Sequence, residues 1–182
     1  MWSLADLNAM DRAAFCAVLG GIFEHSSWIA ESAWARGPFA SRTALLAAMK
    51  EVLAGAGTER QLALIRAHPD LAGKAAMAGE LTRHSRDEQA SAGLDRLSAE
   101  EFARFQELNR AYRERHGFPF IVCVRLTDKA GIFAAYERRL GNDRATETAE
   151  ALAQIGEIAR LRLEGLVPAS WPPVEEGSRW DA

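Results

Sequence analysis

The sequence predicts an all-α fold, a single-domain bundle of about eight helices, and three observations lead to this prediction. Apolar residues recur three and four positions apart along most of the 182 residues, which is the spacing of a helix with one buried face. Three stretches, which begin at Thr58, Ser85 and Ser98, have the Ser/Thr-x-x-Glu/Gln pattern of a helix start. Only the run 118–124 has strand-like composition, and a single extended segment cannot form a sheet.

The composition is that of an ordinary globular domain, with 48% hydrophobic and 26% charged residues. The net charge of -3 provides no basic field that would attract nucleic acid or an anionic membrane. Cys16 and Cys123 lie far apart in apolar surroundings and are expected to be reduced thiols, and the N-terminus lacks a signal-peptide pattern, so a cytoplasmic setting is expected. The helical domain is expected to span 1–167, with an extended C-terminal tail at 168–182.

The first half of the chain is predicted to form four helices, each with a cap or a terminator. In chain order they run from Asn8–Asp11 to Gly20, from Ser27 to Gly37, from Ser41 to Gly55, and from Thr58 to His68. Between the first two, the residues 24–26 are predicted to form a turn. Trp28 and Trp34 are expected to pack in the core.

The second half is predicted to hold five helical stretches, of which the first is short or broken by Gly73 and Gly79. They cover 70–81, 85–93, 98–116, 127–140 and 143–167. His116 is interpreted as a cationic residue at a helix C-terminus, where the helix dipole favours positive charge.

The stretch 68–97 is where the chemistry is expected. A residue before proline is disfavoured in the helical region, so His68, which precedes Pro69, should stand at a helix end. Ser85 is predicted as an N-cap with Glu88 in the first turn, where free N–H groups and the helix dipole keep a carboxylate ionised. Taken alone, these residues are more often capping or surface residues than catalytic ones.

Two features elsewhere suggest a polar pocket within the helical core. At 100 degrees per residue, Arg162 lies about 20 degrees from Ile155, in the middle of a buried seam, and a guanidinium in a core needs an anion. That anion is a protein carboxylate such as Glu88 or a substrate carboxylate, and the two are not exclusive, because a resting ion pair can open to admit a ligand. The backbone of 118–124 also needs partners, which are either a polar heterocycle or the ends of neighbouring helices.

Four strings in order along the chain resemble the family of 2-oxo-4-hydroxy-4-carboxy-5-ureidoimidazoline (OHCU) decarboxylases of urate degradation in purine metabolism. They are HPDLAGK from His68, SRDEQASAGLD from Ser85, GFPF from Gly117 and ARLRL from Ala159. The resemblance covers about residues 5 to 167. It implies a cofactor-independent lyase that removes the C4 carboxylate of OHCU and delivers (S)-allantoin and CO2, and it implies a homodimer.

The resemblance also implies roles for individual residues. His68 would be the catalytic acid/base, and Glu88 and Arg162 would assist it. The residues implied to bind substrate are Pro69, Ser85, Arg86, Asp87, Glu88, Gln89, Phe120, Ile121, Val122, Cys123, Val124 and Arg162. No metal or organic cofactor is expected, and His84 matches no family role.

Two other readings remain open from the residues themselves. One is a metal-dependent hydrolase with His68, His84 and Glu88 as ligands, although this spacing is not a recognised zinc pattern. The other is a non-catalytic helical protein that binds a partner, in which Arg162 and Glu88 pair in the core. Turnover of freshly generated OHCU distinguishes the decarboxylase from this partner-binding protein.

Overall fold

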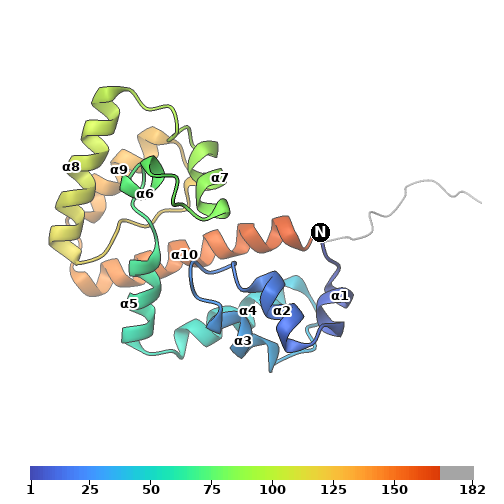
Figure 1. The fold of residues 1–182 in the computed structure, drawn as a ribbon. Helices are drawn as coiled ribbons and strands as arrows, with labels where there is room; N and C mark the ends of the chain where they lie inside the picture. Colours follow the sequence, from blue (N-terminus) through green and yellow to red (C-terminus); the bar gives the residue numbers. More distant parts are fainter. Residues whose placement is uncertain (169–182) are drawn as a thin grey trace, which may run out of the picture. The chain divides into compact units, whose positions relative to one another are not determined.

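The computed structural model describes residues 1–168, apart from the side chain of Ala75, and these residues form helices and no strand (Figure 1). This confirms the predicted all-α class. The helices are α1 (Leu4–Ala9), α2 (Arg12–Leu19), α3 (Trp28–Trp34), α4 (Arg42–Ala54), α5 (Thr58–Ala67), α6 (Lys74–Met77), α7 (Arg83–Ser91), α8 (Ala99–His116), the 3-10 turn η1 (Val124–Leu126), α9 (Lys129–Arg139) and α10 (Arg144–Leu166). The predicted tail lies, apart from Pro168, outside the described residues. None of the described helices combines the length and the apolar character that crossing a membrane requires.

The chain gathers into two compact units. Among the described residues, one unit contains Met1–Leu53 together with 159–168, and the other contains Ala54–Ile158. The boundary between Ile158 and Ala159 falls inside α10, so that this helix contributes residues to both units.

The start of the first unit differs from the prediction. The helix predicted from 8–11 to Gly20 is α2, which Asp11 caps by accepting the Ala14 N–H at 2.8 Å, and an unpredicted helix, α1, precedes it because Ser3 and Asp6 form a capping box. Asn8 therefore lies within α1, and its side-chain amide accepts the Phe39 N–H and donates to the Phe39 carbonyl, each at 2.8 Å.

The core of the first unit is formed by the apolar faces of its helices, and α2 packs against α3. Its fully buried side chains include Leu7, Phe15, Leu19, Ile29, Ala33, Leu45 and Met49. The tryptophans contribute less than predicted, since Trp28 is half-buried and Trp34 is 38% exposed and donates its indole N–H to the Met10 carbonyl. Ser27 occupies the N-cap position of α3, but its side chain makes no capping hydrogen bond.

In the second unit, aromatic side chains join α8 and α9. The Phe105 ring of α8 lies 4.7 Å from the Phe133 ring and 6.4 Å from the Tyr136 ring of α9. The predicted capping box of Ser98 and Glu101 at the start of α8 is confirmed.

Three other predicted caps in this unit are wrong by one to three residues. Gly57 stands before α5, Thr82 caps α7 by accepting the Ser85 N–H at 3.3 Å, and Asp128 caps α9 by accepting the Gly131 N–H at 2.8 Å. Glu88 is consequently in the middle of α7, and the argument for its charge from the first turn does not apply.

His116, the last residue of α8, is 2% exposed and packs between the rings of Tyr112 and Phe118. Burial lowers its pKa, assisted by the charges of Arg115 and Arg139 and opposed by Glu147 and a hydrogen bond with the Arg139 backbone. The interpretation of His116 as a cation favoured by the helix dipole is therefore wrong.

Candidate functional site

The imidazole of His68 stands at the C-terminal end of α5, as its position before proline predicts. His68 is the C-cap of α5, with φ -74° and ψ 141°, and only 6% of the residue is exposed. Its Nδ1 lies 2.9 Å from the Leu64 carbonyl oxygen. A carbonyl can only accept, so Nδ1 carries the hydrogen and the buried Nε2 of the neutral ring carries a lone pair. Nε2 is therefore the atom that can take or return a proton.

Side chains of helix α8 fix the loop that follows His68. Arg113 of α8 binds both carboxylate oxygens of Asp70 at 2.9 and 3.0 Å, and Asn109 and Gln106 of the same helix donate to the Leu71 and Ala72 carbonyls at 2.9 and 2.8 Å. Within the loop the backbone passes so close that a Cβ on Gly73 would lie 2.7 Å from the Asp70 Cβ. The His68 imidazole therefore stands at the start of a loop that hydrogen bonds from α8 hold in place.

The predicted residues of α7 divide between its two sides. Ser85 and Gln89 are each 6% exposed, and Glu88 beside them is half-buried, as expected for positions three and four apart on one face. Arg86 and Asp87 are exposed; Arg86 donates to the carbonyls of the preceding turn at 3.3 and 3.5 Å. Their predicted role in substrate binding stays a prediction.

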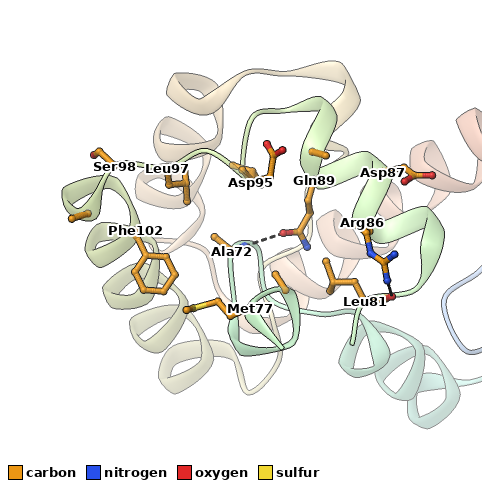
Figure 2. A pocket seen from close by; sticks show the side chains of 14 residues that line it. Ala72, Met77, Leu81, Arg86, Asp87, Gln89, Asp95, Leu97, Ser98 and Phe102 are labelled. Atoms are coloured by element: carbon orange, nitrogen blue, oxygen red, sulfur yellow. Dashed lines mark hydrogen bonds between the residues drawn. The ribbon is translucent and has the colours of Figure 1, made fainter. Parts of the chain in front are cut away.

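Gln89 links α7 to the loop after His68. Its Oε1 accepts the Ala72 N–H at 3.0 Å, as the dashed line in Figure 2 shows. Because this partner is a donor, the oxygen of the amide must face it, and the NH2 group is turned away as a donor for another group.

The run 118–124 contains no helix or strand before η1 begins at Val124, and side chains rather than helix ends hold the backbone of its middle part. Arg139 donates to the Ile121 carbonyl at 2.7 Å, and Gln154 accepts the Cys123 N–H at 2.9 Å. Val122 between them is half-buried, and no described residue hydrogen-bonds its N–H or its C=O. Among the five predicted binding residues 120–124, Val122 is the one that is not buried, so we take its backbone groups as the ones most accessible to a ligand.

The second unit brings these three segments together, although they are far apart in the sequence. Gln89 joins α7 to the His68 loop, and α7 packs against η1 at the end of the extended run. Burial raises the pKa of the Cys123 thiol, and the charge of Glu88 raises it further, so Glu88 is close enough to act on this segment. Cys123 therefore stays a neutral thiol near neutral pH and is not a thiolate nucleophile.

A cavity of about 700 Å³ lies beside this region, between the turn around α6, helix α7 and the start of α8 (Figure 2). Met77 and Phe102 point toward one another across it. Its lining includes Arg86, Asp87 and Gln89 from the predicted set. His68 does not line it, so this cavity is not where His68 would act.

In the first unit, Arg162 is buried as its position in the α10 seam predicts, with 4% of the residue exposed. Its Nη1 donates to the Glu24 carboxylate at 2.9 Å, and both side chains are 2% exposed. The same nitrogen lies 3.4 Å from the Gly21 and Ile22 carbonyls. The anion that meets Arg162 in its own unit is thus Glu24, which the sequence analysis placed only in a turn.

The described residues contain no cluster of three or more His, Cys, Asp or Glu side chains that could hold a metal ion. His68, His84 and Glu88 are all described, and His84 is exposed on α7. These three residues therefore do not form the ligand set that the hydrolase reading requires.

Comparison with known proteins places this arrangement in a family. The profile described as OHCU decarboxylase matches residues 8–164, which is most of the chain. The chain belongs to the OHCU decarboxylase family. This confirms the resemblance stated from the four sequence strings.

Members of the OHCU decarboxylase family resemble this chain over most of its length. A 2-oxo-4-hydroxy-4-carboxy-5-ureidoimidazoline decarboxylase of Haloferax volcanii is 44% identical over 88% of this chain and 94% of its own. The uric acid degradation bifunctional protein PucL of Bacillus subtilis is 42% identical over 92% of this chain and 33% of its own. A crystal structure of (S)-allantoin synthase, 31% identical, superposes with a TM-score of 0.71 over 91% of this chain, which spans about half of that protein (54%).

Three polar residues that contact predicted site residues were not predicted from the sequence: Glu24, Arg139 and Gln154. Arg139 closes α9 and could have been noticed as a charge in an otherwise apolar stripe with Ile132 and Tyr136. Glu24 and Gln154 carry no such local signal, because their partners lie 138 and 31 residues away in the sequence.

Proposed function

We propose that this protein is a decarboxylase of urate degradation that converts OHCU to (S)-allantoin and CO2. The observation that supports this most is the gathering of the His68 loop, the inner face of α7 and the 120–124 run in one compact unit of a family member. Three of the four family strings lie in or beside these segments, and the fourth, ARLRL from Ala159, lies in α10. They supply a proton-transfer group, amide donors and an open backbone residue.

The proposed reaction breaks the bond between C4 and the carboxylate. The electron pair of this bond passes into the conjugated ring, and one proton is taken up overall as CO2 leaves. Hydrogen bonds to the ring heteroatoms stabilise the charge that develops, and the Gln89 NH2 group and the Val122 N–H are the donors we assign to this role.

We assign the proton transfer to Nε2 of His68. An imidazole exchanges protons near neutral pH, and the Leu64 carbonyl fixes the tautomer in which Nε2 is the base. Nε2 would take the C4 hydroxyl proton or return a proton to the ring, and delivery to one ring face yields one enantiomer. Glu88 and Arg162 keep the assisting roles that the resemblance implies. Arg162 offers a buried positive charge for an anionic substrate, and its ion pair with Glu24 would open or be shared on binding.

The test is to mix the purified protein with freshly generated OHCU and follow the circular dichroism of allantoin. We expect turnover faster than spontaneous decay, and we expect His68→Asn to lower kcat by at least about 100-fold while the helical signal is retained. His84→Asn, which changes an exposed histidine on α7, is the matched control and should keep wild-type turnover. Absence of acceleration by the wild-type protein would favour the partner-binding reading instead.

We also propose a homodimer in the cytoplasm. Both cysteines are free, which suits a reducing compartment, and the resemblance implies the dimer. Light scattering coupled to gel filtration measures the state directly, and a mass of one chain at all concentrations would contradict the dimer.

A further inference from the structure

The second unit contains a buried ion pair that the proposed reaction does not use. Arg139 is 1% exposed and binds Glu147, which is fully buried. Glu147 also accepts hydrogen bonds from the Tyr112 hydroxyl and from Asn142. A buried ion pair seldom adds stability over a well-packed apolar pair, so its presence calls for another explanation.

The guanidinium of Arg139 also binds the backbone of the run 118–124. Its Nη1 donates to the Ile121 carbonyl at 2.7 Å, and its Cζ lies 4.5 Å from the centre of the Phe120 ring. The Phe120 ring is itself held in place, because it stacks on the Tyr136 ring with ring centres 3.7 Å apart. The ion pair therefore holds a guanidinium at a set place against residues 120 and 121.

Gln154 of α10 fixes the next peptide group. Its Oε1 accepts the Cys123 N–H at 2.9 Å, while its Nε2 donates to Glu150 at 3.2 Å, so both ends of the amide are engaged. The two side chains thus hold the two peptide groups on either side of Val122.

Because the peptide bond is planar, these two contacts fix the directions of the N–H and C=O groups of Val122. Both peptide bonds are trans, and in a trans peptide the C=O and the N–H point in opposite directions. Arg139 holds the Ile121 C=O, so the Val122 N–H of the same peptide points away from Arg139. Gln154 holds the Cys123 N–H, so the Val122 C=O points away from Gln154.

We propose that Arg139 and Gln154 are positioning residues that orient the N–H and C=O of Val122 as a donor and acceptor pair for the ring of the substrate. The ligand class this pair fits is a cyclic amide or ureide, which offers a C=O and an N–H on one edge. The inference rests on the proposed function, because it specifies how the 120–124 run would bind the ring.

Gln154→Leu and Gln154→Glu form the first comparison. Leucine removes the acceptor, whereas glutamate keeps an oxygen for the Cys123 N–H, and Gln154 is only half-buried, so neither change opens the core. We expect KM for OHCU and Kd for (S)-allantoin to rise about tenfold in the leucine variant, as for loss of one hydrogen bond, and to recover in the glutamate variant. Glu150→Ala is the control, since it leaves the bond to Cys123 in place, and its KM should stay within about twofold of wild type.

Arg139→Lys is the second comparison, because lysine keeps the charge beside Glu147 but cannot hold both Glu147 and the Ile121 carbonyl with a planar fork. We expect KM to rise by a similar factor in a variant that retains its helical circular dichroism. A KM that stays at the wild-type value in both Gln154→Leu and Arg139→Lys would overturn the proposal.

Amide NMR of the ligand-free protein separates this proposal from the proposed function. We expect the Val122 and Cys123 amide signals to shift, and the Cys123 amide to exchange faster with solvent, in Gln154→Leu but not in Glu150→Ala. Unchanged signals would overturn the positioning role even if the wild-type protein turns over OHCU. Shifted signals in a protein without turnover would contradict the proposed function and leave the positioning role standing.

Discussion

The inward orientation of Arg162 shows what helical geometry alone can predict for one residue. Its angle relative to Ile155 placed it in the buried seam, and the structure leaves it 4% exposed. The identity of its partner could not be obtained in the same way. Glu24 lies 138 residues earlier, in a turn with no periodicity, so nothing local marks its carboxylate as buried.

Replacing Glu24 tests the strength of this buried pair. Glu24→Gln keeps the shape of the side chain but removes the negative charge that lies 2.9 Å from the buried Arg162 guanidinium, so we expect the free energy of unfolding to fall by about 3 kcal/mol. Urea denaturation measures the change. Glu31→Gln is the matched control, because the Arg12–Glu31 pair is 62% and 41% exposed and is expected to contribute under about 1 kcal/mol. Equal effects of the two variants would contradict a special role for burial.

His116 should make the stability of the protein depend on pH. Burial holds its pKa below the unfolded value of about 6.5, so the unfolded chain binds more protons as the pH falls through that value. The contribution of His116 is therefore fully present above about pH 6.5 and is lost as the pH falls toward the lower folded pKa. His116→Phe, which keeps a ring against Tyr112 and Phe118, should flatten this part of the stability curve. Denaturant titrations between pH 5 and 7.5 test this, and a slope equal to that of the wild type would refute it.

At the scale of the elements, the spacing of apolar residues located the helices better than the capping patterns located their ends. Ser98 and Glu101 form the predicted box, but the similar patterns at Thr58 and Ser85 do not cap. The capping pattern misplaces a helix start where two residues that can form a cap lie close together in the sequence. Thr82 precedes Ser85 by one turn, and a local pattern cannot decide which of two hydroxyls accepts the backbone N–H.

The position of the α7 cap can be tested directly. Thr82→Ala removes the oxygen that accepts the Ser85 N–H, and we expect the free energy of unfolding to fall by about 1 kcal/mol. Thr82→Ser retains the hydroxyl and should stay within about 0.5 kcal/mol of the wild type. If both variants lose the same stability, then the hydroxyl of residue 82 is not the cap and the methyl group is what matters.

At the scale of the whole molecule, the periodicity of apolar residues could not predict how segments far apart in the sequence come together. The residues of the proposed site were named through the family resemblance, and what joins them is a set of long-range bonds from side chains. Gln89 reaches back 17 residues to Ala72, and Asn109 reaches back 38 to Leu71. Such contacts depend on the tertiary fold, and no pattern within a single helix encodes them.

The predicted single domain of 1–167 requires that the two compact units unfold together. Helix α10 belongs to both units, so melting either one removes the surroundings of one end of this helix. We expect a single calorimetric transition whose van't Hoff and calorimetric enthalpies agree. Gly165→Ala sharpens the test. The added Cβ meets nothing within 4 Å, and alanine favours the helix by about 0.5 kcal/mol near its end. If the two units unfold together, Gly165→Ala should raise the midpoint temperature of a single transition. Two transitions, with the midpoint of only one raised by Gly165→Ala, would show that the units are separate folding domains.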